Sequence, residues 1–201
     1  MVLQREPREA VLWGWCHPKD VKCAVTVSLE GTSYRANRSE VPQAIGEFLQ
    51  KRWEVSLPPQ PASGPFSITV RSGIAFMSLH DVYFGDVFAC AGQSNMAYTI
   101  PQTFLKREEE EKDEKYDFPY IRVMNVGRKD SGVLLADWEA PPKLTWSLAS
   151  RETLHQGAEG DLWDRFSAVC WFYGRELFEE LQIPIGLVEM AVGGSPLQVS
   201  F

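Results

Sequence analysis

Ser94 is the residue of this chain whose surroundings best suit chemistry. It lies in the pentapeptide Gly92-Gln93-Ser94-Asn95-Met96, directly after an apolar run over Val82–Cys90. A glycine two positions before a serine at the end of a strand permits a sharp turn, which exposes the hydroxyl and aims backbone N–H groups at a developing oxyanion. The pattern predicts a serine nucleophile for ester hydrolysis. Helix capping by Ser94 is the alternative, because serine and asparagine are common at helix N-termini.

Several further motifs, taken in order along the chain, resemble the sialate O-acetylesterase family of the SGNH-type hydrolases. The resemblance covers nearly the whole chain, with poor matches at 104–118 and 150–164. An ordered set of motifs is more specific than a single serine turn. The motifs that carry the resemblance are Val11–Trp15, His80–Met96 (HDVYFGDVFACAGQSNM), Ser167–Arg175 (SAVCWFYGR), Ile183–Val188 and Gly193–Pro196 (GGSP).

The resemblance implies a role for each matched site residue. Ser94 would be the nucleophile, and its N–H would share an oxyanion hole with the N–H of Gly193 or Gly194. The implied substrate is an O-acetylated sialic acid or a related acetylated sugar, and no cofactor or metal is implied. Without the resemblance, the two glycines would be interpreted as an ordinary turn after a strand.

Two parts of the family's catalytic machinery have no counterpart here. They are a tryptophan-tyrosine-glutamine-glycine-glutamate run and the Asp-x-x-His segment that holds the general base. The resemblance is therefore to the N-terminal portion of the family, and a missing C-terminal portion of the same enzyme is an expected partner. The alternative is a truncated, inactive family member with at most a binding role. A sheet that ends after a third parallel strand at 185–192 would expose an apolar edge.

A serine hydroxyl needs a base to remove its proton, so the three histidines are the candidates to consider. His17 is predicted to lie in a surface turn beside Pro18. His80 precedes the strand that leads to Ser94, which places it toward the opposite end of that strand. His155 lies in a loop-like segment and is the only one free enough to reach a site, although a loop histidine is usually just solvated.

The composition excludes several classes of partner. The 201 residues are 44% hydrophobic and carry a formal charge of −7, with no basic patch to offset it. This charge predicts no binding to nucleic acid or to an anionic membrane. No run approaches the ~20 apolar residues of a membrane span, and no apolar leader segment follows Met1. The family resemblance implies a lysosomal or secreted protein, whereas the chain made as given would be cytoplasmic.

The four cysteines form no C-x-x-C pair, which argues against a metal cluster. Cys16 and Cys23 could form a disulfide if they lie on adjacent strands of a hairpin. Cys90 is predicted to be a buried strand residue. Free thiols are the default expectation for all four.

The predicted fold is α/β with two domains. Residues 1–79 show short alternating runs such as Ala24–Leu29, separated by turn residues such as Pro58–Pro65, and predict a β-sandwich-like region. Residues 80–201 predict a truncated flavodoxin-like, SGNH-type parallel sheet, with Ser94 and Gly193/Gly194 at the carboxyl ends of its strands.

The elements predicted for the second domain alternate between strands and helices. A long connection is expected over 131–148, where it would cross the sheet edge and wall the substrate pocket. The other predicted elements are a strand at Val82–Cys90, a helix near Met96, a strand at Ile121–Val126, a helix at Phe166–Leu181 and a strand at Ile185–Val192.

Overall fold

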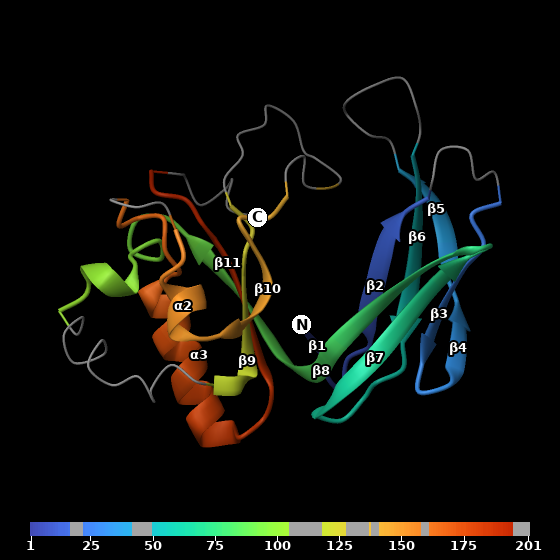
Figure 1. Ribbon diagram of the computed structural model, residues 1–201, viewed down its shortest axis with the longest axis horizontal. Coiled ribbons are helices and arrows are strands. Elements are labelled where there is room, and N and C mark those ends of the chain that lie inside the picture. Colours follow the sequence, from blue (N-terminus) through green and yellow to red (C-terminus); the bar gives the residue numbers. More distant parts are fainter. Residues whose placement is uncertain are drawn as a thin grey trace. The chain divides into compact units, whose positions relative to one another are not determined.

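The structure is a computed structural model that describes residues 1–16, 22–41, 50–104, 118–127, 137, 141–157 and 161–194. The chain forms two compact units (Figure 1). Unit 1 comprises Met1–Val2, Asp86–Lys129 and Ala140–Phe201, and unit 2 comprises Leu3–Gly85 and Asp130–Glu139. The units divide between Gly85 and Asp86, within one long strand, whereas the sequence placed its domain boundary a few residues earlier, at 79/80.

Unit 2 consists of antiparallel β-structure. One sheet has the order β2-β6-β5, and in the other β7 lies between β3 and the first part of β8, with β4 beyond β3. The strands of this unit are β2 (Ala10–Trp15), β3 (Val25–Leu29), β4 (Thr32–Arg35), β5 (Asn37–Val41), β6 (Gln50–Leu57), β7 (Ser63–Ser72) and the first part of β8 (Ala75–Gly92). A short strand β1 (Val2–Gln4) pairs with β8.

The alternating pattern of the first domain was correctly interpreted as strands. In β3, Val25, Val27 and Leu29 are buried while the residues between them are partly exposed. This alternation places one face of the sheet against the interior of unit 2. Both sheets contribute buried residues, including Leu12 and Val55 from the β2-β6-β5 sheet. The β-sandwich arrangement itself stays a prediction.

Unit 1 is built on a mixed sheet with the order β10-β9-β11-β8. β9 (Phe118–Asn125), β11 (Ile185–Ala191) and the second part of β8 run parallel, and β10 (Leu144–Ala149) is antiparallel to β9. The helices α2 (Arg151–Leu154) and α3 (Ala168–Leu181) lie beside these strands (Figure 1). No helix among the described residues is both long and apolar enough to span a bilayer.

Helix α3 forms where the sequence predicted it. Ser167 caps its N-terminus, since the Ser167 hydroxyl accepts a hydrogen bond from the Cys170 N–H at 3.1 Å. Gln182 ends the helix in the left-handed conformation, with φ 52°. The buried residues Ala168, Trp171 and Gly174 recur every three or four positions, so one face of α3 packs on the sheet.

The strand order differs from the flavodoxin-like prediction. In the flavodoxin-like order the first strand lies between the second and the third, whereas here the third parallel strand, β11, lies between β9 and β8. The expected exposed edge at 185–192 is therefore wrong, because β11 is hydrogen-bonded on both sides and Leu187 is 0% exposed. Sequence alternation gives the order of elements along the chain but not their order in the sheet.

In two further segments, the structure differs from the helix and the loop that the sequence predicted. A turn over Gln93–Ala97, followed by the short 3₁₀ helix η1 (Ile100–Gln102), replaces the α-helix expected near Met96. Within 131–148, the end of the expected long connection is strand β10, which pairs with β9. Asp137, the one described residue between 128 and 140, accepts a hydrogen bond from the Trp15 indole within unit 2.

All four cysteines form disulfides, so the expectation of free thiols is wrong. Cys16 bonds to Cys23 in unit 2, and Cys90 on β8 bonds to Cys170 on α3 in unit 1. Cys90 is buried, as predicted, at 5% exposure. The pair Cys90–Cys170 could not be recognised from spacing, because 80 positions separate the two residues.

Candidate functional site

The turn that carries Ser94 begins where β8 ends. Gly92 adopts φ +154°, and a Cβ at this position would lie 2.9 Å from the Met96 Cβ, so the turn requires glycine there. The Ala97 N–H donates to the Gln93 carbonyl oxygen at 2.9 Å and closes the turn. Ser94 is exposed. The local geometry thus presents the serine hydroxyl at the carboxyl edge of the sheet.

Gly193 lies next to Ser94 because β11 and β8 are parallel neighbours. Ala191 pairs with Gly92, and the Val192 N–H donates to the Gly92 carbonyl oxygen at 2.9 Å. A Cβ placed on Gly193 would lie 3.9 Å from the Ser94 Oγ. The structure therefore brings these two predicted site residues together across two strand ends.

Gly194 follows in the same exposed turn, at φ +78°. A Cβ on Gly194 would meet no atom within 4 Å. Of the two glycines that the sequence offered for the oxyanion hole, Gly193 is the one whose Cβ site lies within 4 Å of the Ser94 Oγ. The catalytic roles of all three residues stay predictions.

No histidine within the described part of the chain forms a hydrogen bond with Ser94. His80 belongs to unit 2, where its Nδ1 lies 3.1 Å from the Ser67 Oγ. His155 follows α2, is half-buried, and borders a surface hollow with Arg151 and Glu152. His17 lies outside the described residues. The geometry therefore assigns no base to Ser94.

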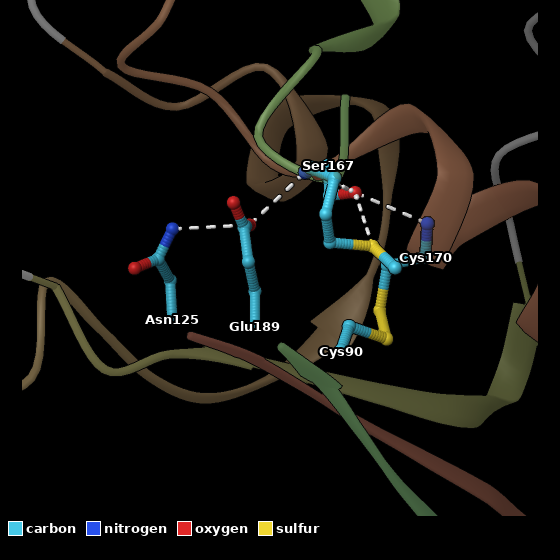
Figure 2. The surroundings of a disulfide bond; sticks show 6 residues. Cys90, Asn125, Ser167, Cys170 and Glu189 are labelled. Carbon is cyan, nitrogen blue, oxygen red and sulfur yellow. Dashed lines mark hydrogen bonds between the residues drawn. A yellow bond between two sulfur atoms is a disulfide. The ribbon is translucent and has the colours of Figure 1, made fainter. Parts of the chain in front are cut away.

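Sequence reasoning missed Glu189, a carboxylate on the central strand β11. The residue is 4% exposed, and its Oε2 accepts hydrogen bonds from the Asn125 Nδ2 at 3.1 Å and from the Ser167 N–H at 3.0 Å (Figure 2). An acidic residue inside the apolar run Ile185–Val192 was the available signal, because a glutamate buried in a central strand must find hydrogen-bond partners.

Burial raises the pKa of Glu189 to about 7 from its ordinary 4.5. The Ser167 N–H, the Lys143 ammonium and the Asn125 amide each oppose this shift, since they stabilise the ionised form. Glu189 is therefore close to half-ionised near neutral pH. A carboxyl group with such a pKa is able to exchange a proton under ordinary conditions.

A cavity of about 270 Å³ adjoins this cluster in unit 1. Lys143 and Asp164 form an ion pair on its wall. Its lining combines the apolar side chains of Leu144 and Phe166 with the polar residues Asn125, Lys143, Thr153, Gln156, Asp164 and Arg165. Such a mixture of amide, hydroxyl and charged groups suits a polar ligand. The described residues contain no group of three or more histidine, cysteine or carboxylate side chains placed to hold a metal ion.

Curated relatives match almost the entire chain. The human and orangutan (Pongo abelii) sialate O-acetylesterases are each 34% identical over 204 residues, which is 98% of this chain and 36% of theirs. The rat (Rattus norvegicus) sialate O-acetylesterase is 35% identical over 203 residues. The chain thus spans about a third of the length of the curated relatives it matches. No protein-family model matches it.

A solved structure of an acetylesterase is similar to this chain in fold. The crystal structure of a carbohydrate acetylesterase from Xanthomonas citri superposes with a TM-score of 0.74 and 26% identity, covering 98% of this chain and 39% of that one. The agreement in sequence and in fold extends over both units. The chain belongs to the sialate O-acetylesterase-like family.

Proposed function

We propose that this chain takes part in hydrolysing O-acetyl esters of sialic acids or of related acetylated sugars. The observation that carries the proposal is the position of Gly193, whose Cβ site lies 3.9 Å from the Ser94 Oγ at adjacent ends of parallel strands. Esterase relatives of the chain support the same reaction class. We further propose an SGNH-type fold for unit 1 and a β-sandwich for unit 2.

In the proposed mechanism, the Ser94 Oγ attacks the carbonyl carbon of the acetyl group while a base takes the hydroxyl proton. The N–H groups of Ser94 and Gly193 stabilise the negative charge that develops on the carbonyl oxygen. The sugar hydroxyl leaves with a proton, and water then attacks the acetyl-serine to release acetate and restore Ser94. No cofactor or metal takes part in this scheme.

The base is the remaining requirement. No described histidine is hydrogen-bonded to Ser94, and the chain spans about a third of its relatives' length. We propose that the base comes from the portion of the family protein that this chain does not span. That portion would then be the partner needed for full activity.

That no described histidine is hydrogen-bonded to Ser94 also favours a second candidate function. If no base reaches Ser94, the chain would be an inactive family member that binds acetylated sugar without turning it over. The polar cavity beside Asn125 and Lys143 would suit such binding. The two candidates differ in whether acetate is released.

The disulfides bear on localisation. Disulfides persist in oxidising compartments and are rare in the cytosol. Both pairs, Cys16–Cys23 and Cys90–Cys170, therefore support our proposal of a lysosomal or secreted protein.

The test is acetate release from 9-O-acetylated sialic acid by the purified, folded chain. We expect Ser94→Ala to reduce turnover by about 10³-fold or more, because no other group replaces the nucleophile. Ser150→Ala, which removes a serine hydroxyl at the start of α2, should leave turnover unchanged. Turnover that survives Ser94→Ala would refute Ser94 as nucleophile.

A folded chain without turnover is also expected if the base lies in the portion that this chain does not span, and acetate release once that portion is added would then support hydrolysis. No release with that portion present would favour the binding function. Sugar binding measured by calorimetry would then distinguish a binding protein from an inert one. If turnover is present, His155→Ala tests the one loop histidine that the sequence offered as a base. Loss of turnover in that variant would place the base within this chain.

A further inference from the structure

The Ser94 turn projects from the sheet with its first three residues exposed. Gln93, Ser94 and Asn95 are all solvent-accessible, and the Ala97-to-Gln93 hydrogen bond closes the turn. An exposed turn of this kind gains little from its own packing, so the segments that flank it must determine its position. The flanking residues on both sides contact the same place, the first turn of α3.

The downstream side of the turn is held by Ser167. This residue is fully buried, and its hydroxyl donates to the Met96 carbonyl oxygen at 2.5 Å. The next residue along α3 adds a second bond, in which the Ala168 N–H donates to the Tyr98 carbonyl oxygen at 2.8 Å. Met96 lies two positions after Ser94, so these bonds act close to the hydroxyl.

The upstream side is held by the Cys90–Cys170 disulfide. Cys90 lies two positions before Gly92 on β8, and its Cα is 5.8 Å from that of Cys170. The Cys170 N–H donates to the Ser167 hydroxyl at 3.1 Å. The disulfide and Ser167 are therefore neighbours in a single helical turn, as Figure 2 shows.

Ser167 also reaches the strand that carries Gly193. Its backbone N–H donates to the Glu189 Oε2 at 3.0 Å, and Glu189 lies on β11 four positions before Gly193. The hydroxyl of this buried serine thus bonds the segment that follows Ser94, and its N–H bonds the strand that precedes Gly193.

We infer that Ser167 is a positioning residue, which together with the Cys90–Cys170 disulfide fixes the Ser94 turn on α3 and so sets its place beside Gly193. Its catalytic meaning depends on the proposed function of Ser94. The structural claim does not, because the order of the turn can be measured without any turnover.

The experiment compares amide hydrogen exchange by NMR in the wild-type chain and in Ser167→Gly. Glycine is a good helix N-cap, so this variant keeps α3 while it removes the hydroxyl that donates to Met96. We expect exchange of the Ala97 amide to accelerate about fivefold to tenfold, as befits one lost buried hydrogen bond. Ser167→Ala should give at least the same acceleration, and Ser167→Thr, which retains the hydroxyl, should restore slow exchange.

Ser150→Ala is the matched control, because Ser150 caps α2 through the Thr153 N–H and has no described contact with the Ser94 turn. It should accelerate exchange near Leu154 and leave Ala97 unchanged. The inference would be overturned if exchange of the Ala97 amide is unchanged in Ser167→Gly. It would also be overturned if Ser167→Gly accelerates exchange equally at Ala97 and at Leu154.

Turnover provides the second readout. If the wild type releases acetate, Ser167→Gly should lower kcat several-fold with little change in KM, since only the position of the nucleophile is disturbed. If the wild type releases no acetate even with the remaining portion of the family protein added, while its Ala97 amide still responds to Ser167→Gly, the proposed function is refuted and the positioning role is upheld.

Discussion

The two units each contain one disulfide, and the two bonds act over very different distances along the chain. In unit 2, Cys16 and Cys23 are separated by 7 positions and link the end of β2 to the segment before β3. In unit 1, Cys90 and Cys170 are separated by 80 positions and join a sheet strand to a helix. The first bond joins two residues close together in the sequence, whereas the second fixes the tertiary arrangement around Ser94.

The two units also differ in how deeply a representative glutamate is buried. In unit 2, Glu54 on β6 is paired with Arg52 at 3.0 Å near the surface, with its side chain 48% exposed. In unit 1, Glu189 is buried between two neutral donors, the Asn125 amide and the Ser167 N–H. The buried polar and charged residues of the described chain all lie in unit 1, and they are Thr99, Arg122, Asn125, Ser167 and Glu189. A region that orients groups for chemistry requires such buried hydrogen-bonding partners.

Removing the disulfides should give the largest difference between the units. A disulfide lowers the conformational entropy of the unfolded chain, and the effect grows with the length of the loop that it closes. Cys90→Ala/Cys170→Ala should therefore lower the free energy of unfolding by about 4.5 kcal/mol, and Cys16→Ala/Cys23→Ala by about 2.5 kcal/mol. Urea denaturation of the two double variants measures both values. Equal losses would contradict the view that only the unit 1 disulfide acts at long range.

Glu189→Gln should reveal the cost of the buried carboxylate. The pKa of Glu189 is raised to about 7 in the folded chain, so the folded state binds the proton more tightly than the unfolded state. Stability from this group is therefore greatest below pH 4.5 and falls as the pH rises to 7, by about 3 kcal/mol in all. At pH 8 the glutamine variant should be the more stable by up to that amount.

The measurement is the free energy of unfolding of both proteins between pH 4 and pH 8. The two curves should converge at the acid end, since Glu189 is neutral there in both states. Glu54→Gln in unit 2 is the control, and it should change stability by less than about 1 kcal/mol, because exposed ion pairs contribute little. A constant difference between Glu189→Gln and the wild type at every pH would show that burial does not control this group.

Two glycine substitutions should give the smallest effects and separate packing from backbone strain. In unit 1, a Cβ at Gly174 would lie 2.5 Å from the Leu187 Cδ1, so Gly174→Ala should cost about 1–3 kcal/mol through overpacking. In unit 2, Gly73 has φ +59° and no atom within 4 Å of its Cβ site, so Gly73→Ala should cost about 1 kcal/mol through strain alone. Thermal denaturation compares the two, and a larger loss for Gly73→Ala would reverse the interpretation.

The sequence predicted the parts of the fold that depend on short-range patterns. Alternation identified the strand at Val25–Leu29, and apolar periodicity identified α3 to within two residues of its observed start, at Ala168. The motif Gly92–Met96 and the two glycines Gly193 and Gly194 were chosen from residue types and from the family resemblance. The structure brings these two segments together because parallel strands end at the same edge of a sheet.

The tertiary structure alone decided the order of the strands, the pairing of Cys90 with Cys170, and the cluster of Asn125, Ser167 and Glu189. The physical reason is that local sequence fixes how a segment folds, whereas its neighbours depend on contacts between residues far apart in the chain. Placing β11 between β9 and β8 buries Leu187 and puts Glu189 under the start of α3. The sequence by itself determined which residues could do chemistry, and the sheet order determined which of them meet.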